Sequence, residues 1–224
     1  MKRELPIAIF RPFINVLTKR STIVSPDRWP VRIISGFARG CKLATPPNQK
    51  QSIRPTADRA REGLFNILQD RTRNALVLDL FAGTGAIGLE AFSRGASSVV
   101  FVDRDRHALR LIDENIRRCS SGRTIDTKQL QVIQHDLSRG LPLARFPDRQ
   151  FDLIFADPPY DKEISLAILK SLHNSNLLSK HGVFILEERR NVVLPEQFSC
   201  YELTDQRKYG EAGFWFYRLC ENKD

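Results

Sequence analysis

Residues 77–90 read V-L-D-L-F-A-G-T-G-A-I-G-L-E, an apolar run that leads into glycines at G-x-G-x-x-G spacing. The apolar run predicts a buried strand at 75–80, and the residues after it predict a helix near 85–94. Glycines at Gly83 and Gly85 let the backbone turn tightly and approach a ligand, while the helix N-terminus offers unpaired N–H groups. The spacing also marks nicotinamide and flavin enzymes, so by itself it indicates a fold and not a ligand.

Strand and helix patterns alternate after this turn. Such alternation predicts an α/β fold with a mostly parallel sheet, covered on both faces and binding its ligand beyond the carboxyl ends of the strands. We expect two strand-like runs within 199–219 to pair antiparallel at one edge of the sheet. The other predicted strands are 98–103, 130–135, 152–157 and 182–187, and the other predicted helices lie near 105–118 and 162–176.

An acid lies at or just after the end of each of the first three predicted strands: Asp79, Asp103 and Asp136. Asp103 stands where a carboxylate accepts both hydroxyls of a ribose. Asp79 would repel a dinucleotide pyrophosphate at the turn, but it suits a cationic cofactor such as S-adenosylmethionine, which carries a sulfonium and an ammonium. We place Asp136 near the adenine amine of that cofactor.

Residues 152–160 run from a buried strand into Asp157, two prolines and Tyr160. The prolines hold φ at about −65° and remove two backbone donors, which leaves a stiff bracket of acceptors beside an aromatic ring. The Asp157 carboxylate and the Pro158 carbonyl suit the two protons of a nucleobase amine, with Tyr160 stacked on the base. The alternative is a structural turn in which Asp157 caps the next helix and Tyr160 packs against the protein.

The positive charge is concentrated at one end of the chain. The net charge is +9, and residues 1–74 hold 15 Lys and Arg against 5 Asp and Glu, a net of +10. A localised positive surface attracts a polyanion, so RNA or DNA is the expected partner. Each candidate RNA contact can equally be a solvated charge. The candidates are Arg32, Arg39, Lys42, Arg59, Arg61 and Lys208.

Three parts of the chain differ in pattern. Residues 1–30 show no sustained periodicity, so we expect little fixed structure there. This segment can be an RNA-contacting arm, a targeting leader or a poorly ordered tail. Residues 31–74 predict a basic hairpin around Gly36 to Gly40, then a helix capped by Thr56. Gly63 inside that helix costs about 1 kcal/mol relative to Ala, so packing must hold it. Residues 75–224 form the predicted cofactor-binding domain.

Composition excludes several classes of protein. The four cysteines contain no C-x-x-C pair, which argues against a zinc site, a redox dithiol or a disulfide framework. No stretch approaches the roughly 18 consecutive apolar residues of a membrane span, and no secretory signal is evident. We expect a cytoplasmic monomer without a metal or a membrane partner.

The combined motifs resemble the S-adenosylmethionine-dependent nucleic-acid amine methyltransferases, and within them the bacterial RsmD family, which methylates guanine N2 in 16S ribosomal RNA. The resemblance covers roughly residues 31–219. It rests on R-I-I-S-G from Arg32, R-P-T from Arg54, R-E-G-L-F-N from Arg61, the glycine turn, S-R-G-A from Ser93, D-P-P-Y from Asp157 and K-Y-G from Lys208.

The resemblance implies a Rossmann-like class I methyltransferase with a seven-stranded sheet, whose antiparallel strand we place at the edge. It implies a base held at Asp157 to Tyr160, and a segment with Arg54 and Thr56 folded over the methionine end of the cofactor. Arg54 pairs either with the cofactor carboxylate or with RNA phosphate. The cofactor-binding candidates are Arg54, Thr56, Asp79, Phe81, Gly83, Thr84, Gly85, Asp103, Arg104 and Asp136.

Several alternatives stay open at this point. The chemistry of the loop does not distinguish guanine N2 from adenine N6, or RNA from DNA, and only the resemblance favours 16S rRNA, naked or within a small ribosomal subunit. A nicotinamide-dependent oxidoreductase explains the glycine spacing but neither Asp79 nor the D-P-P-Y loop. A non-catalytic RNA-binding module would explain the basic first 74 residues.

Overall fold

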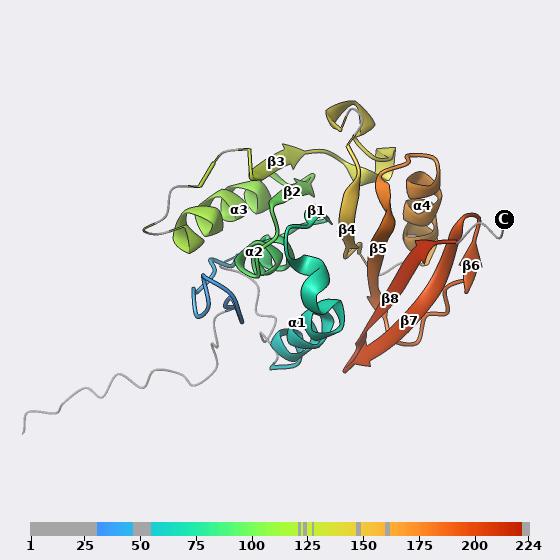
Figure 1. Cartoon of the computed structure of the whole chain (residues 1–224), viewed down its shortest axis with the longest axis horizontal. Coiled ribbons are helices and arrows are strands. Elements are labelled where there is room, and N and C mark those ends of the chain that lie inside the picture. Colours follow the sequence, from blue (N-terminus) through green and yellow to red (C-terminus); the bar gives the residue numbers. More distant parts are fainter. Residues whose placement is uncertain are drawn as a thin grey trace, which may run out of the picture.

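The computed structural model describes residues 31–46, 55–120, 122, 125–126, 128–146, 149–159 and 162–220. It has an eight-stranded sheet in the order β3-β2-β1-β4-β5-β8-β7-β6, flanked by helices (Figure 1). The predicted α/β fold is therefore confirmed. The predictions for residues 1–30, Arg54 and Tyr160, and for the side chain of Thr56, lie outside the described part of the chain.

Five parallel strands form the part of the sheet that follows the predicted alternation. β1 pairs with β2 and β4, β2 pairs with β3, and β4 pairs with β5, all in parallel. Their carboxyl ends therefore share one edge, which we call the carboxyl edge. The five strands are β1 (Leu76–Leu80), β2 (Ser98–Asp103), β3 (Leu130–Gln134), β4 (Phe151–Ala156) and β5 (Leu178–Arg189).

The C-terminal strands correct two details of the prediction. The sheet has eight strands and not seven, because a two-residue strand, β6 (Gln197–Phe198), pairs with β7 (Tyr201–Tyr209). The antiparallel strand β8 (Ala212–Leu219) lies between β5 and β7 and not at the edge. Its residues Gly213–Tyr217 are all buried, as a strand covered on both faces requires, whereas β7 is mostly exposed.

The prediction for β5 was too short. The strand begins at Leu178, which pairs with Phe151, and the register shifts before Leu153 pairs with Val183. Lys180 and His181 are exposed beside this irregularity, so the sequence there looks like a turn.

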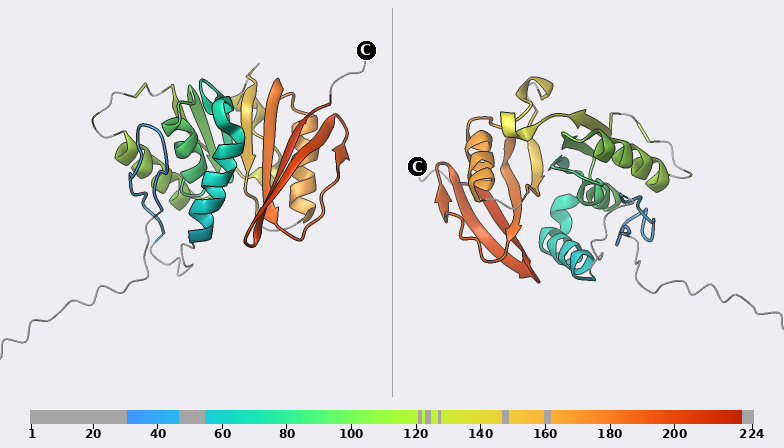
Figure 2. Two further views of the ribbon diagram at one scale, coloured as in Figure 1. Left: turned by 60° about the horizontal axis from the view of Figure 1, so that its bottom comes forward. Right: turned by 180° about the vertical axis from the view of Figure 1, so that it is seen from behind.

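Helices cover both faces of the sheet (Figure 2). α1 (Pro55–Leu68), α2 (Ala86–Ser93) and α3 (Arg106–Cys119) pack on one face, and α4 (Lys162–His173) packs on the other. Short 3-10 segments at Gln69–Thr72, Leu137–Arg139 and Leu143–Arg145 complete the connections. Because α1 begins at Pro55, Thr56 lies inside its first turn and not at the predicted capping position. No helix in the described ranges is long and apolar enough to span a membrane.

The basic hairpin forms, but its two sides pair only at the Arg32–Lys42 bridge. Most of its tip is bonded to α2 instead. The Phe37 N–H donates to the Ser93 carbonyl over 2.9 Å, and the Ala38 N–H donates to Ser93 Oγ over 2.9 Å. Ile33 and Leu43 of the hairpin belong to the same hydrophobic core as the helices of this face.

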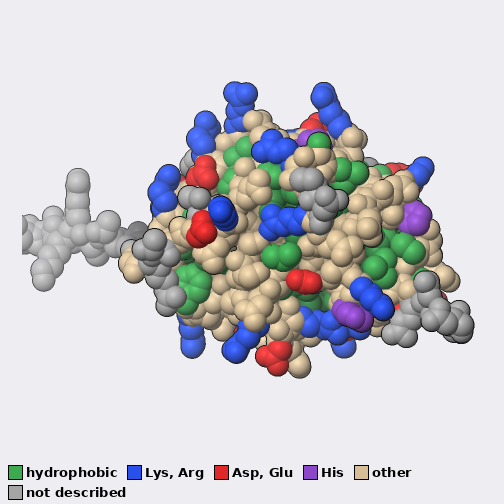
Figure 3. All heavy atoms as spheres, turned by 45° about the horizontal axis from the view of Figure 1, so that its top comes forward, with side chains coloured by type: hydrophobic (Ala, Val, Ile, Leu, Met, Phe, Trp, Pro, Cys, Tyr) green, Lys and Arg blue, Asp and Glu red, His purple; other side chains and the backbone are tan. Residues whose placement is uncertain are grey.

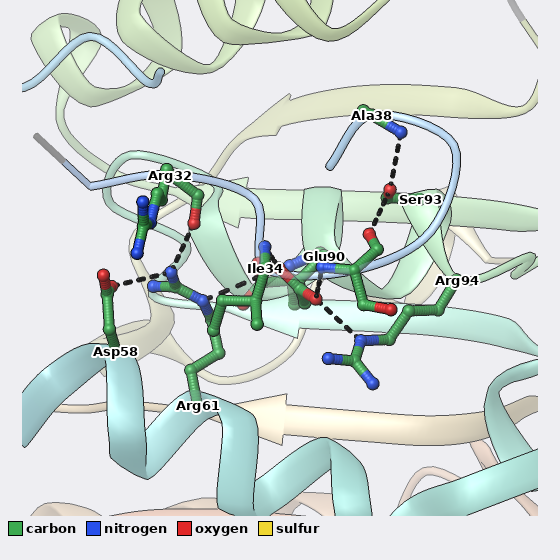
Figure 4. Close-up of polar contacts among 11 residues, drawn as sticks. Arg32, Ile34, Ala38, Asp58, Arg61, Glu90, Ser93 and Arg94 are labelled. Atoms are coloured by element: carbon green, nitrogen blue, oxygen red, sulfur yellow. Dashed lines mark hydrogen bonds and ion pairs between the residues drawn. The ribbon is translucent and has the colours of Figure 1, made fainter. Parts of the chain in front are cut away.

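A fully buried carboxylate, Glu90 of α2, holds the hairpin (Figure 4). Its Oε2 accepts the Ile34 N–H over 2.7 Å, and its Oε1 accepts the Ser35 N–H over 3.0 Å. Two guanidinium groups balance the charge, with Arg94 Nε 2.7 Å from Oε1 and Arg61 Nε 3.9 Å from Oε2. A buried charge is tolerated only when it is paired and hydrogen-bonded, and Glu90 meets both conditions.

Gly63 has a packing reason. A Cβ atom at this position of α1 would lie 2.3 Å from the Tyr209 hydroxyl and 2.6 Å from its ring atom Cε1. The missing side chain therefore lets the end of β7 pack against α1, where Tyr209 also contacts the ring of Phe214. The conformational cost of the glycine is offset by this approach.

We expect Gly63→Ala to destabilise the protein by about 1–3 kcal/mol, because the added methyl overlaps a rigid ring. Chemical denaturation measures the change. In a Tyr209→Ala background the same substitution should stabilise the protein by about 0.5–1 kcal/mol, the ordinary effect in a helix interior. The same sign in both backgrounds would refute the packing explanation.

We expect Glu90→Ala to lower the free energy of unfolding by about 3–5 kcal/mol, because it leaves the Arg94 guanidinium and the Ile34 and Ser35 N–H groups without their acceptor. The matched control is Glu114→Ala, which removes an exposed ion pair with Arg118 on α3 and should change stability by less than about 1 kcal/mol. Urea denaturation compares the two variants, and equal losses would contradict the role assigned to Glu90.

Candidate active site

The carboxyl edge of the sheet collects acids from three neighbouring strands. Asp79 belongs to β1, Asp103 ends β2, and Asp157 follows the last residue of β4. They lie close enough to interact, because repulsion from Asp157 and Asp103 contributes to a raised pKa at Asp79. The structure thus brings Asp79 and Asp103, two of the three acids predicted at strand ends, together with Asp157 of the D-P-P-Y segment. Such an edge favours a cation.

Asp79 is buried at 4% exposure behind the glycine turn. Its Oδ2 accepts the Gly88 N–H over 2.9 Å, so it caps the first turn of α2 in place of Gly85, which has no side chain for that purpose. Burial is the main cause that raises the pKa of Asp79 to about 7, with like-charge repulsion adding to it and the Gly88 bond opposing it. Asp79 therefore both supports the turn and supplies negative potential behind it.

The turn itself has an unusual backbone. Phe81 adopts φ 58°, a left-handed conformation that costs a non-glycine residue energy. Gly85 has φ 76° and precedes the first residue of α2. A Cβ at Gly85 would lie 3.2 Å from Ile112 and 3.3 Å from Phe101, so the helix start is also tightly packed against α3 and β2. The turn thereby presents its backbone, and not bulky side chains, to the carboxyl edge.

Asp103 braces the same turn from β2. Its Oδ2 accepts the Gly83 N–H over 2.9 Å, and its Oδ1 accepts the Asp105 N–H over 2.9 Å. Each carboxylate oxygen can accept a second hydrogen bond, so both remain able to receive a ribose hydroxyl. The backbone bonds hold the carboxylate in one orientation before any ligand arrives.

A cavity of about 320 Å³ adjoins the turn between the ends of β1 and β3 and helix α4. Phe81, Arg104, Asp136 and Pro159 are among its lining residues. Hydrogen bonds from the Ser138 hydroxyl and N–H hold the pKa of Asp136 below its usual range, and Arg104 and Arg139 lower it further. Asp136 is therefore an ionised acceptor in a largely apolar wall, as an adenine amine requires.

The residues present fit S-adenosylmethionine. The acidic edge suits its positive charges, Asp103 suits the ribose, and the cavity with Asp136 suits the adenine. No group of three or more His, Cys, Asp or Glu side chains in the described ranges is arranged to hold a metal ion.

The D-P-P segment lies next to this site. Pro159 lines the cavity, Pro158 is buried, and Asp157 is exposed. Although solvent reaches the side chain of Asp157, surrounding protein raises its pKa to about 7 by desolvation, and repulsion from Glu188 adds to this. Helix α4 begins at Lys162, so Asp157 lies too far upstream to be its N-cap, and the capping alternative fails.

Two acids near Asp157 were not predicted as site residues. Ala156 pairs with Leu186 in parallel, so Glu187 is the neighbour of Asp157 across the sheet. Burial, followed by repulsion from Asp157, raises the pKa of Glu187 well above its ordinary value. Glu188 points elsewhere, because its Oε2 accepts the Ser165 hydroxyl over 2.9 Å. In the sequence, the sign that these residues are unusual is that Glu187 and Glu188 stand together in an otherwise apolar strand.

One candidate RNA contact must be withdrawn. Arg61 is 6% exposed, and its Nη2 donates to Asp58 over 2.9 Å and to the Arg32 carbonyl over 2.6 Å. Its charge is used inside the protein, so it is not available to RNA. Arg32, Arg39, Lys42, Arg59 and Lys208 are exposed.

The exposed candidates do not form one cluster. Lys208 precedes the β7–β8 turn, which lies at the carboxyl edge because Arg189 at the end of β5 pairs with Ala212. The hairpin tip, with Arg39, is bonded to Ser93 at the far end of α2 and so lies toward the opposite edge. Lys and Arg side chains are likewise spread over the face shown in Figure 3.

Comparisons with known proteins show the family of this chain. The family model described as "Conserved hypothetical protein 95" matches residues 31–218. "Putative rRNA methyltransferase YlbH" of Bacillus subtilis is 34% identical, covering 84% of this chain and 98% of the relative. "Ribosomal RNA small subunit methyltransferase D" of Haemophilus influenzae is 32% identical, covering 86% of this chain and 94% of the relative.

A solved structure gives the same result. The structure of a hypothetical protein from Thermus thermophilus, TTHA0928, superposes with a TM-score of 0.67 at 34% identity, covering 84% of this chain and 99% of that one. Family and fold decide against a nicotinamide-dependent oxidoreductase. The chain belongs to the "Conserved hypothetical protein 95" family, which includes the RsmD methyltransferases, and it is an S-adenosylmethionine-dependent rRNA methyltransferase.

Proposed function

We propose that this protein methylates the exocyclic N2 amine of one guanine in 16S rRNA. The observation that carries the proposal is the stiff D-P-P segment at the carboxyl edge, beside the acids of the cofactor site. The names of the relatives support the small-subunit substrate. The preference for an assembled or partly assembled subunit, the monomeric state and the cytoplasmic location stay predictions.

S-adenosylmethionine, when bound, supplies an electrophilic methyl group on a sulfonium. An aromatic amine is a poor nucleophile because its lone pair is conjugated with the ring. Asp157 and the Pro158 carbonyl draw the two amine protons out of the base plane and so direct the lone pair toward the methyl carbon. Positioning and electrostatics of this kind account for most of the catalysis.

Asp157 also suits proton transfer. A pKa of about 7 lets its carboxylate take the proton that the methylated amine must lose. Tyr160 remains the proposed stacking partner of the base, and Arg54 and Thr56 remain proposed neighbours of the cofactor.

The test is transfer of a tritiated methyl group to small subunits from cells that lack the native enzyme, followed by nucleoside analysis. We expect labelled N2-methylguanosine. Label on adenine would establish the adenine N6 alternative, and rRNA binding without label would establish a non-catalytic module.

In the same assay we expect Asp157→Ala to lower the rate by about 10²- to 10⁴-fold, since it removes an amine acceptor and proton acceptor. Affinity for S-adenosylhomocysteine, measured by calorimetry, should change little. The matched control is Asp113→Ala, an exposed acid on α3, which should keep the wild-type rate. A fully active Asp157→Ala variant would end the proposed mechanism.

The charge of the cofactor should make its binding depend on pH. Asp79 has a pKa of about 7 in the free protein, and a bound sulfonium lowers that pKa, so binding releases a proton. The affinity ratio of S-adenosylmethionine to the uncharged-sulfur product S-adenosylhomocysteine should therefore rise from pH 6 to pH 8, by up to about tenfold.

Calorimetry at several pH values measures this ratio. Asp79→Asn should flatten its pH dependence. Asp136→Asn is the matched control, because Asp136 has a lowered pKa and stays ionised over this range, so the wild-type slope should persist. A ratio that does not change with pH in the wild-type protein would refute the role of Asp79.

A further inference from the structure

We infer that Glu187 selects guanine over adenine by accepting the N1–H of the base while Asp157 and Pro158 hold its N2 amine. This inference rests on the proposed function and deepens it. It assigns to a residue of β5 the discrimination that the D-P-P-Y loop alone does not supply.

The first support is position. β4 and β5 are neighbouring parallel strands (Figure 1). Ala156 pairs with Leu186, so Asp157 and Glu187 follow at the next position along the two strands. Neighbouring strands lie about 4.8 Å apart, so two carboxyl groups at such adjacent positions can reach adjacent atoms of one base. Residues alternate between faces, which places Glu187 on the face of Ile185 and Asp79 and not on that of Leu186.

The second support is the lack of a protein partner. No hydrogen bond or ion pair links the Glu187 side chain to any residue in the described part of the chain, although the residue is partly buried. Its neighbour Glu188 is satisfied by the Ser165 hydroxyl and the Arg189 N–H. The Glu187 carboxyl group therefore keeps its acceptor capacity, and a substrate N–H can supply a donor that the described part of the protein does not.

The third support is the chemistry of the two purines. In guanine the atom beside the N2 amine is N1, which carries a hydrogen and donates. In adenine the atom beside the N6 amine is also N1, but it is an acceptor. A carboxylate next to Asp157 therefore completes the donor edge of guanine and faces a lone pair in adenine. A site built to bond a donor rejects an analogue that lacks it.

The raised pKa of Glu187 is consistent with this role. It reflects burial and the nearby Asp157 carboxylate in a protein that holds no base. A carboxyl group keeps an acceptor oxygen in either protonation state. A protonated Glu187 that donated to the base would instead favour a purine with an unprotonated N1, and the experiment below separates the two cases.

The experiment replaces the target guanine by 2-aminopurine, which keeps the N2 amine but has an unprotonated N1. The substrate is a small subunit reconstituted with 16S rRNA that carries either base, and methyl transfer gives kcat/KM for each. We expect the wild-type protein to prefer guanine by roughly 10- to 100-fold. In Glu187→Gln this ratio should fall to near one, because an amide donates to or accepts from N1.

Glu188→Gln is the matched control, since it removes a neighbouring charge without facing the base and should keep the wild-type ratio. The wild-type comparison of the two bases does not depend on the folding of any variant. Retention of labelled subunits on a filter gives the affinity for each base, a readout besides turnover, and Glu187→Gln should remove the preference of the wild-type protein for guanine.

Three results would overturn the inference while leaving the proposed function standing: equal use of both bases by the wild-type protein, a preference for 2-aminopurine, or an unchanged ratio in Glu187→Gln. A wild-type protein that methylates neither base would instead refute the proposed function, and the inference with it.

Discussion

The burial of carboxyl groups side by side at one edge of a parallel sheet is the constraint on which the site depends. Parallel strands must all end at the same edge, so an acid at the end of each one meets its neighbours there. Desolvation and repulsion between neighbouring carboxyl groups raise the pKa of Asp79 and Asp157 to about 7. The protein tolerates this because a positively charged ligand relieves it, and such destabilised groups are typical of functional sites.

The polar groups that hold the hairpin show the opposite arrangement, because their charges and hydrogen bonds are matched within the protein. On the face covered by α1, α2 and α3, both oxygens of the buried Glu90 carboxylate accept hydrogen bonds from the hairpin, and Arg94 and Arg61 balance its charge. Asn115 plays a similar part at the other end of the hairpin, because its side chain bonds both Ala44 and the Thr84 carbonyl of the glycine turn. Carboxylates and amides paired with protein donors thus fasten the hairpin, whereas the carboxyl edge gathers acids that form no ion pair with a cationic side chain among the described residues.

The sequence predicted most of the fold because strand ends coincide with changes in polarity. β2 was placed to the residue, and β1, β3 and β4 to within one residue at each end. The place of β8 inside the sheet was not predicted. Its continuous apolar run indicates a strand buried on two faces, but it does not indicate which strands lie on either side of it. Glu90 and Arg61 were equally hidden, because their partners are distant in sequence and their charges suggest solvent exposure. Glu187 was not predicted as a site residue, because the sequence does not show that Asp157 of the neighbouring strand lies beside it.

The hairpin is bonded to the protein at two places. Ala44 is bonded to Asn115, whose side chain also bonds the Thr84 carbonyl of the glycine turn, and Ala38 is bonded to Ser93 in the last turn of α2. These bonds join the hairpin to α2, which begins directly after the glycine turn, and to α3, which is bonded to that turn. The exposed hairpin side chains Arg32, Arg39 and Lys42 are therefore mounted on the same helices that hold the glycine turn, so their positions relative to the carboxyl edge follow from the fold itself.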